Sequence, residues 1–189
     1  MSIARLLLVV ALGLELAACD KREPSDCGPS GRVVDPVLLA FLSQARSAHH
    51  LADQHENASD VEGALRALDT LTRSPRPPGS APEVSEVLAD THARRADLLS
   101  RASRFEQATE AIDAGLTNAA APTYFRGHLF EVRGLVEERR EKALREAGRG
   151  PEADQARALS LSAYEEAMKI QADVIQRASP APSPSGQRP

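Results

Sequence analysis

The chain has 189 residues and a net charge of −4, so it lacks the basic excess that is typical of nucleic-acid-binding proteins. Its aromatic content is only 3%, it has no tryptophan, and alanine is abundant. This balance favours helices that pack closely through small residues over a β-sandwich, which would carry more aromatic and β-branched side chains. At this length we expect one folded domain.

The N-terminus has the features of an export signal. An apolar stretch from Leu6 to Leu14 follows a single positive charge at Arg5, and it is too short to span a bilayer, which needs about 20 apolar residues. The motif Leu16-Ala17-Ala18-Cys19 resembles the lipobox of bacterial lipoproteins. The resemblance implies that residues 1–18 are a signal peptide and that lipid on Cys19 anchors the protein to a membrane of the cell envelope. Whether this is the inner or the outer membrane stays open.

Residues 19–34 are expected to form the lipidated end and a flexible tether, because charged residues, Pro, Ser and Gly are mixed there. Cys27 lies in this tether and has no intramolecular partner once Cys19 carries lipid. Two interpretations remain open for Cys27: an intermolecular disulfide, or an ordinary residue of the tether.

Two helices are predicted next. Asp35-Pro36 is a typical helix start, an N-cap followed by proline at the first helical position. The segment from Ser59 to Glu62 has the pattern of a capping box and predicts a second helix, which ends before Pro75. The apolar positions of the two helices recur every three or four residues: Phe41, Ala45, Ala48 and Ala52, then Ala64, Leu68 and Leu71.

Four more helices follow in the remaining sequence. The third and fourth are predicted over residues 82–102 and 104–116, and Pro122 is predicted to start the fifth. The second half of the fifth helix, Glu137 to Glu146, is almost wholly charged, and we expect it to be a solvated face.

The sixth helix begins after Pro151 and carries two apolar stripes, which predicts packing against more than one neighbour. The stripes are Ala156, Leu159, Ala163, Ala167 and Ile170 on one side, and Leu161, Tyr164, Met168 and Ile175 on the other. Residues 178–189 are mostly Pro, Ser and Ala, and we expect a disordered tail.

The segment from Arg104 to Ile112 resembles the second helix of a tetratricopeptide repeat. That family has small residues at two positions twelve apart and a large apolar residue four further on; the matching residues are Ala96, Ala108 and Ile112 in the second pair and Ala52, Ala64 and Leu68 in the first. The resemblance implies an all-α domain over residues 35–177, with about six helices in antiparallel pairs stacked as a short tetratricopeptide-like α-solenoid. A plain helical bundle is the alternative.

Catalytic motifs are absent from the sequence. It has no Gly-x-Ser-x-Gly, no phosphate-binding glycine loop and no His-Glu-x-x-His, so we expect neither an enzyme nor a cofactor. His49 and Asp53 lie one turn apart on a helix and could supply two ligands to a metal ion. A site needs further ligands, and we therefore predict a polar helix face rather than a metal site.

The repeat resemblance also implies where a partner would bind. In tetratricopeptide solenoids the first helix of each pair lines the concave face, which suits an extended peptide or a partner helix. The residues that this register places on such a polar groove are Arg46, His49, Asp53, Glu56 and Asn57 from the first pair, and Asp90, Asp97 and Arg101 from the second.

Two functions agree with these features. The first is a membrane-anchored, non-catalytic lipoprotein whose helical-repeat domain, in the periplasm or extracytoplasmic space, binds another envelope protein as a scaffold or assembly factor. The second is a small-ligand or metal-binding envelope lipoprotein, a sensor or substrate-handling subunit with a pocket between helices. The partners expected for the protein are the membrane, through lipid on Cys19, and an envelope protein, but not nucleic acid.

Overall fold

The computed structural model describes residues 35–179, and the regular structure in this range is entirely α-helical, so the predicted all-α class is confirmed there. The lipobox with Cys19, the tether with Cys27 and the tail from residue 180 lie outside the described residues. The helices are α2 (Pro36–Asn57), α3 (Val61–Thr72), α4 (Pro82–Arg101), α5 (Phe105–Asn118), α6 (Tyr124–Glu146) and α7 (Gly150–Ala178). Among these helices, none is both long and apolar enough to cross a lipid bilayer.

Side-chain caps set the starts of α2 and α3. The Asp35 carboxylate accepts a hydrogen bond from the Val37 amide at 2.8 Å, and Pro36 is the first helical residue, as predicted. The predicted cap at Ser59 is wrong: Ser59 has a positive φ of 58°, and Asp60 caps α3 by accepting from the Gly63 amide at 2.8 Å. The short turn between α2 and α3 needs one left-handed residue, and Ser59 takes that role, which moves the cap one position along the chain.

The start of α6 also differs from the prediction. The helix begins at Tyr124 rather than at Pro122, because the Thr123 hydroxyl accepts from the Arg126 amide and acts as the N-cap. The Arg126 guanidinium in turn donates to the carbonyl of Ala119 at 2.9 Å, which ties the start of α6 to the turn after α5.

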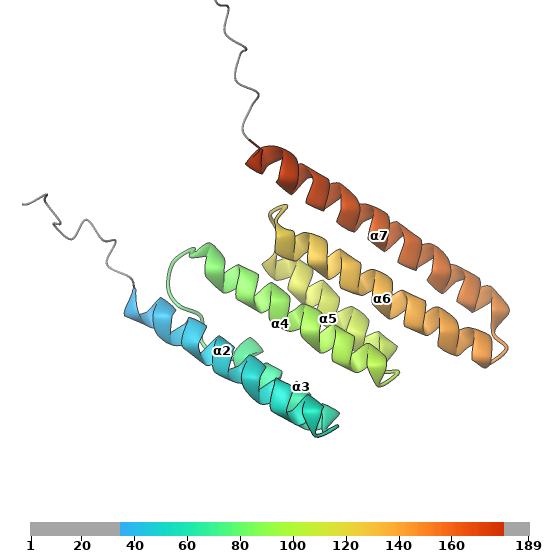
Figure 1. Ribbon diagram of the computed structural model, residues 1–189, viewed down its shortest axis with the longest axis horizontal. Coiled ribbons are helices and arrows are strands. Elements are labelled where there is room, and N and C mark those ends of the chain that lie inside the picture. The colour runs from blue at the N-terminus through green and yellow to red at the C-terminus, as the bar shows by residue number, and fades with distance from the viewer. Residues whose placement is uncertain (1–34, 180–189) are drawn as a thin grey trace, which may run out of the picture. The chain divides into compact units, whose positions relative to one another are not determined.

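The helices pack as consecutive pairs: α2 with α3, α4 with α5, and α6 with α7. Each pair also packs on the next, since α4 contacts both α2 and α3, and α6 contacts both α4 and α5 (Figure 1). Within the described residues, α7 packs mainly on α6 and therefore lies at the end of the row. The second helix of each pair lengthens along the chain, from 12 residues in α3, through 14 in α5, to 29 in α7.

Small residues are fully buried where the helices pack on one another. The alanines at 52, 64, 96 and 108 are completely buried, as are Leu68 and Ile112, the large residues predicted to follow them. At the α6–α7 contact the small residue is Gly134, whose backbone carbonyl accepts a hydrogen bond from Ser160 at 3.0 Å. Alanine and glycine let helix backbones approach closely, which explains how a chain so poor in aromatic residues builds its core.

Two sequence-based expectations about exposure are wrong. The second apolar stripe of α7 does not pack against a second helix of the described residues, since Leu161, Met168 and Ile175 are 55%, 69% and 66% exposed. No further helix in the described residues packs on that side. The charged run of α6 is not wholly solvated either, because Glu137 turns toward α5 and α7 and is only 5% exposed.

Candidate functional site

The polar residues predicted on α2 and α4 meet around a residue that the prediction left out, Arg94. Its Nη2 lies 2.5 Å from Oδ1 of Asp53 and 2.5 Å from Oε1 of Glu56, and its Nη1 donates to the backbone carbonyl of His49 at 3.1 Å. The Arg94 and Glu56 side chains are 22% and 21% exposed, so their contact is largely shielded from water, whereas Asp53 is 50% exposed. We call this set of ion pairs the Arg94 network.

The Arg94 network continues toward α6. Arg101 lies 2.7 Å from Glu56 and 3.0 Å from Asp97, and Asp97 accepts from Arg139 of α6 at 2.8 Å. Partial burial opposes ionisation of Glu56, but the hydrogen bonds from Arg94 and Arg101 outweigh it and lower its pKa. The network therefore links α2, α4 and α6 through alternating charges.

The remaining predicted residues lie at the margin of this network. His49 is half-buried, with Nε2 3.0 Å from the hydroxyl of Thr91, and burial lowers its pKa even though Asp90 opposes the shift. Arg46 and Asn57 are exposed on α2. The structure thus joins His49, Asp53, Glu56, Asp97 and Arg101, and leaves Arg46 and Asn57 facing solvent.

Sequence reasoning missed Arg94 and Arg139. Arg94 could have been predicted from the sequence, because it follows Asp90 by four residues and precedes Asp97 by three, which places all three on one helix face. Arg139 lies within the charged run of α6, where nothing in the sequence distinguishes it from its neighbours. Within residues 35–179, no cluster of three or more His, Cys, Asp or Glu side chains could hold a metal ion.

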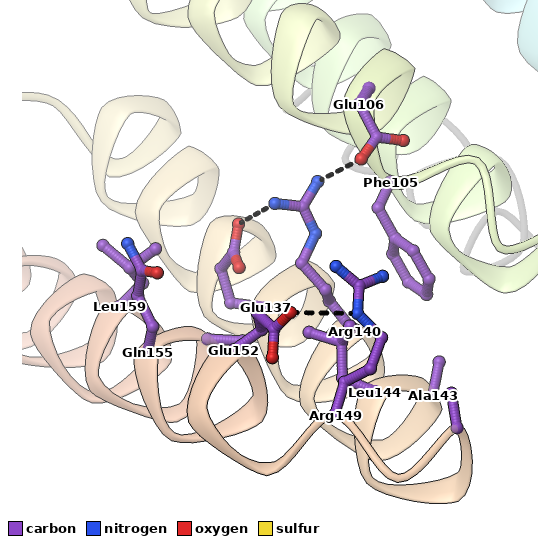
Figure 2. A pocket seen from close by; sticks show the side chains of 12 residues that line it. Phe105, Glu106, Glu137, Arg140, Ala143, Leu144, Arg149, Glu152, Gln155 and Leu159 are labelled. Carbon is purple, nitrogen blue, oxygen red and sulfur yellow. Dashed lines mark hydrogen bonds and ion pairs between the residues drawn. The ribbon is translucent and has the colours of Figure 1, made fainter.

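Hollows lie between the second helices of the pairs. One pocket of about 430 Å³ is bounded by α5, the C-terminal half of α6 and the start of α7 (Figure 2). A second pocket of about 740 Å³ adjoins it, and both are lined by Glu137 and Leu159. We call the two together the α5–α7 groove. A third hollow of about 360 Å³ lies between α3, α4 and α5.

Glu137 is the unusual residue of the α5–α7 groove. Its nearest cation is Arg140, at 3.8 Å, and its Oε2 is buried without a hydrogen-bond partner among the described residues. Figure 2 shows the Arg140 guanidinium between Glu137 and Glu106. Burial raises the pKa of Glu137, an effect that Arg140 and Arg133 only partly oppose.

The outward side of α7 is a third candidate surface. Leu161, Met168 and Ile175, which we call the outer stripe of α7, follow one another at intervals of seven residues. Seven residues are close to two helical turns, so the three side chains line up along one edge of the helix. Comparison with protein-family models, curated proteins and solved structures found no match to the chain.

Proposed function

We propose that the chain is a lipid-anchored, non-catalytic lipoprotein of the bacterial cell envelope, in which a tetratricopeptide-like solenoid binds another envelope protein as a scaffold or assembly factor. The order of helix contacts supports a solenoid, because each pair packs on the next pair in the chain. The complete burial of the small residues at positions 52, 64, 96 and 108 supports the same arrangement.

The observation that carries the binding function is the outer stripe of α7. Terminal units of a helical stack normally have a polar outer face, because nothing covers them. Here α7, the last helix of residues 35–179, instead presents Leu161, Met168 and Ile175, each more than half exposed. Exposed apolar side chains aligned along one edge of a helix support a protein-binding surface there.

The anchor rests on the lipobox at Cys19, which the described residues do not include. A Cys19→Ala variant is expected to stay unprocessed and to take up no fatty acid label in a bacterial host. Continued labelling of this variant would refute the lipid anchor without affecting the binding proposal.

Partner capture tests the binding function. The tagged full chain would be crosslinked in its host, the envelope solubilised in detergent, and the co-purifying proteins identified. A Met168→Gln/Ile175→Gln variant is expected to lose one dominant partner, whereas Leu51→Gln, which changes a 51% exposed residue on α2, should retain it. A partner that both variants retain equally, or a folded chain that captures nothing, would overturn the proposal.

A further inference from the structure

The α5–α7 groove is built as a trough with α6 as its floor. Phe105 and Glu106 of α5 form one wall, Leu159 of α7 lies on the other, and Glu137 and Arg140 rise from α6 between them (Figure 2). Because the two pockets share Glu137 and Leu159, the trough extends lengthwise rather than ending in a compact cavity. Its length and openness suit an extended chain segment.

The charges of the groove are unbalanced. Six acidic and four basic side chains line the two pockets together. Each basic side chain already has a carboxylate partner at the rim: Arg140 pairs with Glu106, Arg149 with Glu152, Arg133 with Asp113, and Lys169 with Glu166. This pairing leaves Glu137 and the exposed Glu165 as the excess negative charges.

Glu137 differs from Asp69, a carboxylate of α3 that lines the hollow one pair earlier in the stack. In the hollow between α3, α4 and α5, Asp69 has two cations close by, Arg95 at 2.7 Å and Arg73 at 2.9 Å. Glu137 is 5% exposed, its nearest cation is 3.8 Å away, and Oε2 has no donor among the described residues. A buried carboxylate without a donor is costly, and a donor that enters the groove would remove that cost.

We propose that the α5–α7 groove binds an extended segment of a partner protein, and that one arginine or lysine side chain of this segment reaches Glu137. The aliphatic stem of that side chain would lie against Phe105 and Leu159, and its cationic head would pair with the Glu137 carboxylate, which would have to turn to bring the buried Oε2 into the groove. The inference rests on the proposed function in taking the ligand to be a protein. It adds the site on this chain and the chemistry of the contact.

A pair of probe peptides tests the contact. The first is a fluorescent, acetylated and amidated heptapeptide with one arginine between two leucines, and the second carries neutral citrulline in place of the arginine. Fluorescence anisotropy with the full chain in detergent is expected to show about ten-fold tighter binding of the arginine peptide, the gain of one charge-assisted contact. Equal affinities for the two peptides would overturn the proposal.

Two isosteric variants locate the contact. Glu137→Gln keeps the shape of the side chain and removes its charge, and it is expected to abolish the preference for arginine over citrulline. Glu131→Gln, on an exposed part of the same helix, should retain the preference in full. A preference that survives Glu137→Gln would refute the role of Glu137.

A photoreactive arginine peptide and a competitor complete the test. Crosslinks should map to α5 and α7 beside the groove, and crosslinks confined to the α2–α4–α6 side would exclude this site. Agmatine, a free alkylguanidine, should displace the peptide only weakly; displacement as strong as that by unlabelled peptide would exclude an extended peptide as the ligand. These results are independent of partner capture, so failure of the groove and failure of the envelope-scaffold function are distinguishable.

Discussion

Gly134 of α6 lies directly under the ring of Tyr164 of α7, so close that a Cβ at position 134 would come within 2.6 Å of the Tyr164 Cε1 atom. Gly134→Ala is therefore expected to destabilise the protein by about 1–3 kcal/mol, despite the better helix propensity of alanine. Chemical denaturation followed by circular dichroism measures this change. Gly150→Ala is the matched control, because a Cβ there meets no atom within 4 Å, and it should leave stability unchanged or slightly raised. Equal losses in the two variants would contradict close packing at Gly134.

Removal of Arg94 is expected to destabilise the N-terminal half of the domain. In Arg94→Met the half-buried carboxylates of Asp53 and Glu56 lose their shared cation, and we expect a loss of about 1–3 kcal/mol. Adding Glu56→Gln should restore part of this loss, which a double-mutant cycle measures. Arg73→Met, which removes a 78% exposed partner of Asp69, should cost less than about 0.5 kcal/mol.

His92 is expected to make the protein acid-sensitive. Its ring is 8% exposed, Nδ1 has no hydrogen-bond partner among the described residues, and burial lowers its pKa to about 4. As the pH falls from about 6.5 to about 4, the unfolded chain takes up a proton that the folded protein does not, and the stability falls by up to about 3 kcal/mol. A His92→Leu variant should lose this part of the pH dependence. Ile112→Val, an ordinary core change, should lower the stability but keep the pH dependence.

Glu137 is expected to lower the stability of the protein as the pH rises, the opposite of the effect of His92. Because burial raises its pKa above 4.5, the folded protein holds this proton more tightly than the unfolded chain does, and stability is lost as the pH rises through the window above 4.5. Glu137→Gln should match the wild type near pH 4 and exceed it in melting temperature at pH 8. A variant that is less stable than wild type at pH 8 would show that the carboxylate is satisfied in the folded protein.

The helices and their buried small residues could be predicted from the sequence because the relevant signals are local. Apolar spacing and turn residues predicted the helices of the described region, and the alanines that matched the repeat pattern are all fully buried. The predicted N-caps were wrong where two candidate residues lie next to each other. Asp60 rather than Ser59 caps α3, and α6 begins after Thr123 rather than at Pro122 because Thr123 is the better cap.

The candidate sites were less predictable, because side-chain pairing depends on how helices far apart in the sequence meet. The register of the predicted first helices brought Asp53, Glu56 and Asp97 to one face, but it did not show that Arg94 would join them. The burial of Glu137 could not be predicted, because it depends on how α5 and α7 pack beside α6, whereas its neighbours in the sequence are charged and indicate an exposed face.

The lengthening of the second helices along the chain has a mechanical consequence. The first pair holds the shortest helix, with 12 residues in α3, whereas the last pair joins helices of 23 and 29 residues. A stack in which each unit is supported mainly by its neighbours opens first where the least surface is buried. A pulling force applied to the chain ahead of Asp35 would therefore act first on the pair that contains the shortest helix. We expect α2 and α3 to unfold under this force while α6 and α7 stay folded.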